Sequence, residues 1–298
     1  MIRLVEVGPR DGLQNEKEIV PVEVKLQFIE ALAQAGYREI EATAFVSPRW
    51  IPQLADAEEV SHQLRPHPDL VYTALIPNRK GLQRALDCGY QRVAVFTAAS
   101  EAFSQKNTNR SIQASLDEFK PLMQDAAAAR VSVRGYVSTA WWCPYGGRIS
   151  ADEVVRVTEQ MLDMGIEEVS LGDTVGLAVP SQVESTLRRL ERHRSRIALH
   201  FHDTSGTALA NVLKAYEMGF EVFDCSAGGL GGCPYAPGAS GNLASEDVIY
   251  MFEQMGVTTG VDLERVARAS LQLAEQMGRK LPGRTLARLQ AGWQAVQG

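Results

Sequence analysis

The chain has 298 residues and a net charge of −6, with 45% hydrophobic and 22% charged residues. This balance is typical of a globular enzyme, and the acidic charge argues against a nucleic-acid partner held by bulk electrostatics. No apolar run approaches the roughly 20 residues of a membrane-spanning helix. The four cysteines form no CxxC pair, so neither a zinc ribbon nor a disulfide framework is expected.

Eight short runs of apolar and β-branched residues predict strands, and helical patterns separate them. The first predicted strand covers 2–8 and the second 39–45. Between them, apolar residues three and four apart predict a helix over 21–36, which begins with proline and ends with glycine. The other strands are predicted at 70–76, 92–98, 132–139, 168–174, 197–203 and 221–227, with further helices at 151–165 and 207–219.

Strand and helix alternate at intervals of roughly 30 residues, and this predicts a (β/α)8 TIM barrel in the α/β class. A doubly wound sheet is the alternative, but its first turn usually carries GxGxxG, and here that turn reads GPRDGLQNE. Helical patterns continue over 242–256 and 262–278. We therefore expect one catalytic domain over 1–298, with the barrel over about 1–256 and additional C-terminal helices over about 257–298.

Polar residues follow the first two strands, and in a barrel functional residues gather where strands end. Arg10 and Asp11 lie in GPRDG, although Pro, Asp and Gly also favour an ordinary surface turn. Glu39 and Glu41 share one face of the second strand. Glu39 is expected in solvent near the bottom of the strand. Glu41 lies nearer the top and is the better functional candidate, with Arg10 as its expected partner.

The seventh strand carries the sharpest signal, because His200 and His202 in LHFHD face the same side. Two hydrogen-bonded core histidines are the structural alternative, but two imidazoles at a barrel mouth make half of a metal site. Asp11 and Asn242 are the candidates for oxygen ligands, and such a set suits Mg²⁺ or Mn²⁺. Zinc would more often recruit Cys233.

Two more aspartates lie at strand ends. Asp173 follows a glycine at the end of the sixth strand, where alone it would be an ordinary turn or capping residue. Asp203 follows the histidine pair directly, and we expect it to orient one of the two rings.

Taken together, these segments resemble the 3-hydroxy-3-methylglutaryl-CoA lyase family. The glycine-rich cysteine loop is the most specific of them, because the related Claisen-type synthases and aldolases share the RDG and HxH elements but not this loop. The matching segments occur in the same order over nearly the whole chain: VGPRDGLQNE (7–16), IEATAFVSPRWIPQ (40–53), SLGDTVG (170–176), LHFHDTSGTALAN (199–211) and GGLGGCPYAPGASGNLASEDVIYM (228–251).

The resemblance implies a TIM barrel that cleaves 3-hydroxy-3-methylglutaryl-CoA to acetyl-CoA and acetoacetate, as in leucine degradation and ketone body metabolism. It also implies a divalent cation, Mg²⁺ or Mn²⁺. The implied metal ligands are Asp11, His200, His202 and Asn242. The implied catalytic residues are Arg10, Glu41, Asp173 and Cys233, and the implied substrate contacts are Arg10 and Lys17.

The residue types agree with this retro-Claisen chemistry. A metal can hold the hydroxyl and a carboxylate, and a permanently charged, fork-shaped arginine such as Arg10 can stabilise the thioester enolate. Cys233 suits proton transfer, either from the hydroxyl or to the enolate. Its segment, 228–242, has six glycines, and we expect it to act as a lid over the barrel mouth.

Three positions depart from the family pattern. Ala44 stands where serine is usual, Thr139 where cysteine is common, and Trp142, beside Trp141, where a small glycine is common. A lyase for a related 3-hydroxyacyl-CoA is therefore an alternative, as are a Claisen-type acyl-CoA synthase, a pyruvate aldolase and a non-enzymatic scaffold. We expect a cytoplasmic protein, since the N-terminus lacks a signal-peptide pattern, and a homodimer or higher homo-oligomer without a membrane partner.

Overall fold

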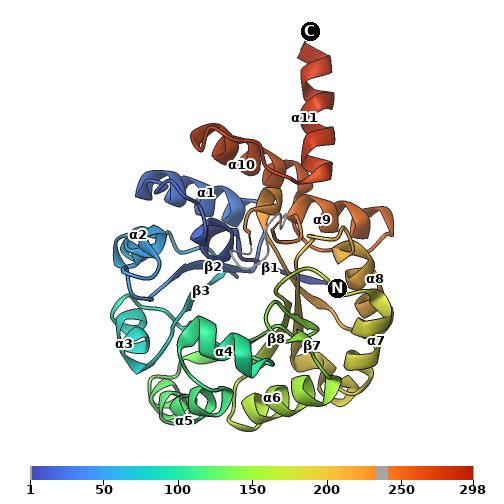
Figure 1. Ribbon diagram of the computed structural model, residues 1–298. Coiled ribbons are helices and arrows are strands. Elements are labelled where there is room, and N and C mark those ends of the chain that lie inside the picture. Colours follow the sequence, from blue (N-terminus) through green and yellow to red (C-terminus); the bar gives the residue numbers. More distant parts are fainter. Residues whose placement is uncertain (1, 233–240, 298) are drawn as a thin grey trace.

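The computed structural model describes residues 2–232 and 241–297, and eight parallel strands close into a barrel at its centre (Figure 1). The order around the barrel is β1-β10-β9-β8-β5-β4-β3-β2. This confirms the predicted (β/α)8 TIM barrel, and each of the eight barrel strands lies within its predicted range. The strands are β1 (Arg3–Glu6), β2 (Glu39–Ala44), β3 (Val71–Leu75), β4 (Arg92–Ala98), β5 (Ser132–Ser138), β8 (Glu168–Asp173), β9 (Ile197–Phe201) and β10 (Val222–Cys225).

Helices surround the barrel, and Figure 1 shows them as an outer ring seen along the barrel axis. The predicted glycine ends are confirmed at Gly165 and Gly219, whose φ angles are 92° and 85°. The helices are α1 (Val22–Gln34), α2 (Ala57–Gln63), α3 (Arg79–Asp87), α4 (Glu101–Thr108), α5 (Ile112–Ala128), α6 (Ala151–Asp163), α7 (Pro180–Arg188), α8 (Ala208–Glu217), α9 (Ser245–Gln254), α10 (Leu263–Gln276) and α11 (Arg284–Gln297).

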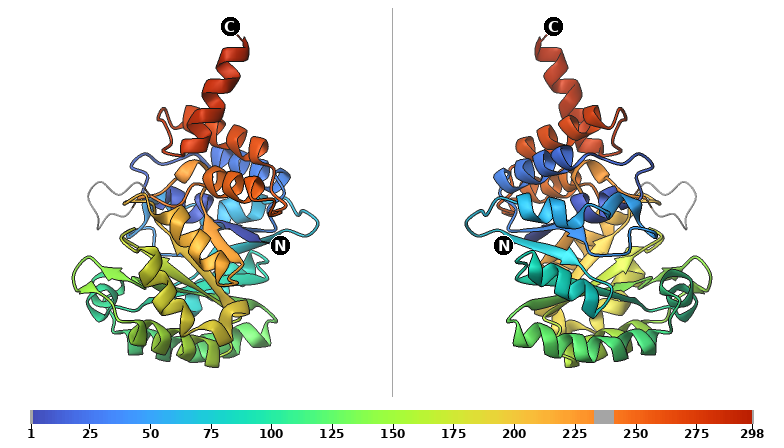
Figure 2. Two further views of the ribbon diagram at one scale, coloured as in Figure 1. Left: turned by 90° about the vertical axis from the view of Figure 1, so that its right-hand side faces the viewer. Right: turned by 90° about the vertical axis from the view of Figure 1, so that its left-hand side faces the viewer.

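The last two helices lie outside the eight strand–helix repeats. Helix α10 packs against α1 and α9, and α11 projects away from the barrel, as both views in Figure 2 show. Within the described ranges, no helix combines the length and apolar character needed to cross a membrane.

The apolar core lies between the strands and the helices, whereas the barrel interior is polar. On β9, Leu199 and Phe201 belong to the apolar core, and His200 points to the opposite side. On β5, Val133 and Val137 do the same, so that Arg134 faces the interior. Because successive side chains of a strand point to opposite faces, charged residues such as Arg134 lie inside the barrel.

Glu39 is not in solvent, and that prediction was wrong. Only 4% of Glu39 is exposed, although it does lie at the amino end of its strand. Barrel closure brings Arg3 and Arg92 to it, and Arg92 Nε donates to Glu39 Oε1 at 2.9 Å. The carboxylate is therefore neutralised by ion pairs rather than hydrated.

A small hairpin follows β5 and was not predicted. Its strands, β6 (Trp142–Cys143) and β7 (Gly147–Arg148), pair antiparallel and form a separate two-stranded sheet. The hairpin follows the carboxyl end of β5, so it lies on the same face of the barrel as the polar strand ends (Figure 1).

Candidate active site

Three predicted ligand residues meet at the carboxyl ends of β1 and β9. The helical turn η1 (Gly8–Gly12) follows β1 and carries Asp11, while His200 and His202 come from β9 and its end. One potential ligand atom from each of the three lies within 4.8 Å of the other two. His200 Nε2 is 3.1 Å from His202 Nε2 and 3.9 Å from Asp11 Oδ2.

Asn242 joins this cluster from the far end of the glycine-rich segment. It forms a β-bridge with His202, and its Nδ2 donates to Asp11 Oδ2 at 2.9 Å. A Cβ at Gly231 would lie 2.6 Å from Asn242 Nδ2, and Gly231 has a φ of 126°. Only glycine combines that conformation with so close an approach, so Gly231 keeps room for the amide.

The donor set fits a divalent cation. Two imidazole nitrogens, a carboxylate and an amide oxygen are ligands that Mg²⁺, Mn²⁺ and related ions accept. Asn242 is 3% exposed, and its Oδ1 has no hydrogen-bond partner among residues 2–232 and 241–297. Buried polar atoms are rarely left unpartnered, so this oxygen is available as a ligand. The chain therefore contains a candidate divalent-metal site.

The charges and the burial around the cluster shift the pKa values of its three side chains. Burial disfavours the ionised form of Asp11, but Arg10, His200 and His202 outweigh it and lower the pKa of Asp11 to about 2. Burial and the neighbouring His200 lower the pKa of His202 to about 4, so its ring is neutral near pH 7. Burial also lowers the pKa of His200, but Asp224 and Asp11 more than offset it and raise the pKa overall.

Arg10 and Glu41 form the expected pair beside the cluster. Arg10 Nε and Nη2 both approach Glu41 Oε2, at 2.6 and 2.5 Å, and Arg10 Nη1 donates to Asp11 Oδ1 at 2.5 Å. Glu41 is fully buried, and its other oxygen, Oε1, has no hydrogen-bond partner in the part of the chain that the structure describes. The guanidinium lies 5.5 Å from the centre of the Tyr136 ring. Its position is thus fixed on three sides, next to the metal ligands.

The other predicted site residues are Asp173, Lys17 and Cys233. Asp173 is fully buried and accepts hydrogen bonds from the backbone of Leu177 and Ala178, at 3.2 and 3.0 Å. Burial raises its pKa to about 6 despite these bonds. Lys17 is exposed in the loop after η1. Cys233 lies outside the described residues, so its predicted catalytic role stays a prediction.

The expectation for Asp203 was wrong, because Asp203 Oδ1 accepts from the backbone N–H of Ala208 at the start of α8. The residue that approaches an imidazole is Asp224 of β10, whose Oδ2 lies 3.2 Å from His200 Nδ1. The available signal was a single aspartate within the apolar run VFDC, on the inward face of the strand.

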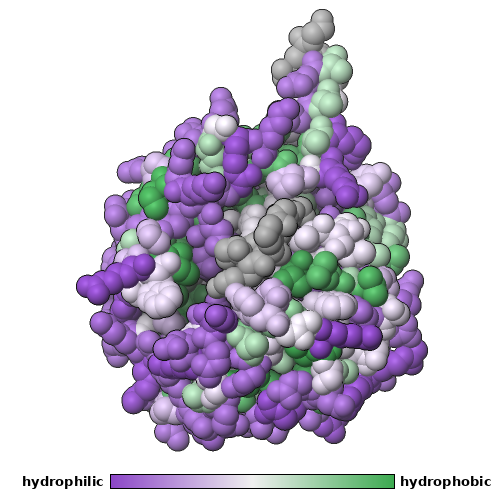
Figure 3. Space-filling model, viewed as in Figure 1, coloured by the Kyte–Doolittle hydropathy of each residue, from purple (hydrophilic) through white to green (hydrophobic). Residues whose placement is uncertain are grey.

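The residues that depart from the family pattern lie near the face of the barrel where the strands have their carboxyl ends. Ala44 belongs to a small apolar cluster with Leu75 and Tyr136, and Trp142 Nε1 donates to Gln182 Oε1 at 3.2 Å. Figure 3 shows a largely hydrophilic surface with apolar side chains gathered near its centre. Leu177 and Val179, in the segment between β8 and α7, are 45% and 38% exposed.

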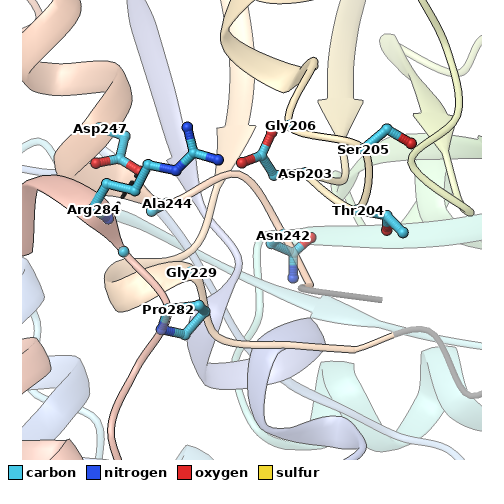
Figure 4. Close-up of a pocket in the computed structure, with 11 residues that line it drawn as sticks. Asp203, Thr204, Ser205, Gly206, Gly229, Asn242, Ala244, Asp247, Pro282 and Arg284 are labelled. Atoms are coloured by element: carbon cyan, nitrogen blue, oxygen red, sulfur yellow. Dashed lines mark hydrogen bonds between the residues drawn. The ribbon is translucent and has the colours of Figure 1, made fainter. Parts of the chain in front are cut away.

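A polar cavity of about 380 Å³ adjoins Asn242 (Figure 4). Asp203 and Arg284 both line it, and the backbone N–H groups of Arg284 and Thr285 donate to Asp247. The cavity thus extends from the ligand cluster to the beginning of α11.

Comparison with known proteins gives consistent matches over nearly the whole chain. A family model described as HMGL-like matches residues 1–272. Hydroxymethylglutaryl-CoA lyase YngG of Bacillus subtilis is 47% identical over 287 residues, which are 96% of each chain. The mitochondrial hydroxymethylglutaryl-CoA lyase of Bos taurus is 48% identical over 94% of this chain and 86% of its own.

Solved structures agree with these matches. The HMG-CoA lyase of Bacillus subtilis superposes with a TM-score of 0.95 at 47% identity, over 97% of this chain and 98% of that chain. An HMG-CoA lyase from A. baumannii, in complex with coenzyme A and 3-methylmalate, superposes with a TM-score of 0.93 at 38% identity, over 97% and 94%.

Proposed function

Because the chain belongs to the hydroxymethylglutaryl-CoA lyase family, we propose that it cleaves 3-hydroxy-3-methylglutaryl-CoA to acetyl-CoA and acetoacetate. One observation carries the proposal beyond the family match. Arg10 bonds both Glu41 and Asp11, and Asp11 lies in a cluster with two imidazoles. A permanent cation and a candidate metal site thus lie side by side at the barrel mouth, which supports a retro-Claisen cleavage.

The proposed substrate is an acyl-CoA thioester. A related structure was solved with coenzyme A, and Arg10 and Lys17 are the proposed contacts in this chain. When bound, a divalent cation such as Mg²⁺ or Mn²⁺ polarises the substrate's hydroxyl and carboxylate oxygens, and Asp11, His200, His202 and Asn242 are its proposed ligands. The four side chains converge from β9, η1 and the end of the glycine-rich segment.

The reaction breaks the C2–C3 bond of the substrate. The electron pair of that bond passes to the thioester enolate, and C3 becomes the ketone of acetoacetate as its hydroxyl loses a proton. Arg10 donates hydrogen bonds to the thioester oxygen as negative charge develops there. Glu41 accepts from two nitrogens of Arg10 and so holds the guanidinium in place. The enolate then takes up a proton at C2 to give acetyl-CoA.

Two further residues have proposed roles in proton transfer. We propose that the thiol of Cys233 exchanges a proton with the hydroxyl or the enolate. Asp173 is the proposed additional acid or base, because burial raises its pKa to about 6, within reach of neutral pH.

The test is product formation from a panel of substrates. Purified protein is incubated with Mg²⁺ or Mn²⁺ and 3-hydroxy-3-methylglutaryl-CoA, and acetoacetate is measured enzymatically. The panel adds 3-hydroxyacyl-CoA thioesters with other branches, since Ala44 and Trp142 depart from the family pattern. It also adds the substrates of acyl-CoA synthases and pyruvate aldolases. Absence of acetoacetate across metals and substrate concentrations would refute the proposal.

We further propose that residues 1–298 act as one catalytic domain, with the barrel over about 1–256 and the helices of about 257–298 added to it. The setting that we propose is leucine degradation in the cytoplasm, with the chain as a homodimer or higher homo-oligomer. Size-exclusion chromatography with light scattering tests the oligomeric state.

A further inference from the structure

A buried arginine lies beneath the candidate metal site. Arg134 of β5 is 0% exposed. Its Nη2 donates to Asp224 Oδ1 at 2.6 Å, its Nη1 to the Tyr136 hydroxyl at 2.7 Å, and its Nε to Glu168 Oε1 at 2.9 Å. The guanidinium is therefore held by three different strands, and it neutralises carboxylates on two of them.

Asp224 links this arginine to a candidate metal ligand. Its Oδ2 accepts from Ser170 Oγ at 2.8 Å and lies 3.2 Å from His200 Nδ1. A carboxylate paired with arginine accepts hydrogen bonds and donates none, so His200 Nδ1 must carry the proton. In the neutral ring, the form that binds a metal, the lone pair of His200 is then on Nε2, the nitrogen that faces His202 and Asp11.

We propose that Arg134 is a positioning residue for the metal site: it fixes Asp224, and through Asp224 it sets the tautomer and the ring orientation of His200. The inference rests on the proposed function only in taking the ligand cluster to bind a divalent cation. It assigns a role to residues midway along the barrel, below the strand ends where the reaction would occur.

The forked shape of the arginine side chain allows it to contact Asp224, Glu168 and Tyr136 at the same time. Two nitrogens of the fork reach Asp224, the third reaches Glu168, and Tyr136 accepts from one of the same nitrogens. A lysine has a single point-like ammonium and cannot hold both oxygens of Asp224 while it pairs with Glu168. Arg134→Lys therefore keeps the positive charge but releases Asp224 from its fixed orientation.

The barrel offers a matched control in Arg92. Arg92 belongs to the same interior network, where it pairs with Glu39 at 2.9 Å, with Glu167 at 2.7 Å and with Glu168 at 3.7 Å. Its side chain is 12% exposed, and none of its recorded ion pairs or hydrogen bonds involves Asp224 or His200. Arg92→Lys thus makes the same chemical change in the same network, at a residue that shares Glu168 with Arg134 but contacts neither Asp224 nor His200 in the described part of the chain.

The experiment measures metal affinity and the histidine tautomer, separately from catalysis. Mn²⁺ is titrated into the metal-free full-length protein, and the free ion is followed by its electron paramagnetic resonance signal. Nitrogen-15 NMR of histidine-labelled protein reports which ring nitrogen of His200 carries the proton, with the signal assigned by its loss in His200→Asn. Arg134→Lys should weaken Mn²⁺ binding by about tenfold to a hundredfold, as loss of a partner behind a metal ligand commonly does.

The outcomes separate positioning from general stability. The inference predicts that Arg134→Lys weakens binding and gives a mixed His200 tautomer, while Arg92→Lys matches the parent in both readouts. Parent-like behaviour of Arg134→Lys, or equal losses in the two variants, would overturn it. Ser170→Ala removes one hydrogen bond to Asp224 and serves if Arg134→Lys does not fold. A parent-like Mn²⁺ affinity and tautomer in Ser170→Ala would then count against the inference. Inactivity with normal Mn²⁺ binding would instead refute the proposed function alone.

Discussion

Replacement of Glu6 by glutamine should stabilise the protein increasingly as the pH rises. Glu6 is fully buried next to the candidate site. Its Oε1 accepts from the backbone N–H groups of Gly8 and Ala227, at 2.8 and 3.0 Å, and its Oε2 accepts from Ser245 Oγ at 2.7 Å. A glutamine can keep these three contacts, because its oxygen accepts from both amides and its NH₂ group donates to the serine oxygen.

The magnitude follows from the burial of the carboxylate. Burial raises the pKa of Glu6 from 4.5 to about 7, although its hydrogen bonds act in the opposite direction. The folded state therefore binds this proton more tightly than the unfolded state between those two values, so Glu6 lowers the stability as the pH rises through them. At about 1.4 kcal/mol per pKa unit, the change amounts to about 3 kcal/mol in favour of Glu6→Gln.

The assay is urea unfolding followed by circular dichroism, at pH values from 4.5 to 8, for the parent and Glu6→Gln. The difference in unfolding free energy should grow from about pH 4.5 to about pH 7 and then level off. Glu58→Gln is the control, because a hydrogen bond from Arg84 lowers the pKa of Glu58 below its usual 4.5, so its charge stabilises the folded state and its titration lies below the assay range. Glu58→Gln should therefore be less stable than the parent by a nearly constant amount at these pH values. Parallel curves for the parent and Glu6→Gln would refute the reasoning.

Three further variants test the site itself. His202→Ala removes one of two imidazole ligands and should weaken Mn²⁺ binding markedly in a calorimetric titration, whereas unchanged affinity would make the histidine pair structural. Glu41→Gln should lower kcat/KM by about a hundredfold, because Arg10 loses the carboxylate that fixes it, and near-normal kinetics would exclude the pair from catalysis. Cys233→Ala should abolish most turnover with metal affinity retained, and an active variant would remove the thiol from the mechanism.

The strands were predictable because β-branched runs, and the glycines that end the helices between them, are local signals. All eight barrel strands fall inside their predicted ranges. The hairpin of β6 and β7 was not predictable in this way, because each of its strands has only two residues and no alternation can show in so short a run. The signal that was present, GG at the end of STAWWCPYGG, marks a turn but no partner strand.

The site also contains residues that could be identified from the sequence and residues that could not. The strand-end residues could be identified from the sequence, because the topology of a barrel brings them to one face. Arg134 and Asp224 could not, since they are 90 residues apart and meet only through the closure and stagger of the strands. Each appears in the sequence as an isolated charge in an apolar strand. Glu39 was wrongly placed in solvent for the same reason, because its partners on β1 and β4 come from distant segments.

These interior charges form a continuous column that ends at the metal ligands. Glu168 at the amino ends of the strands pairs with Arg134, Arg134 with Asp224, and Asp224 with His200. Buried ion pairs often contribute no more stability than well-packed apolar residues, so stability alone does not explain a charged barrel interior. An apolar interior would leave His200 free to rotate and to change its tautomer. Alternating charges on rigid strands fix both, and so the lower barrel determines the orientation of His200 in the candidate metal site.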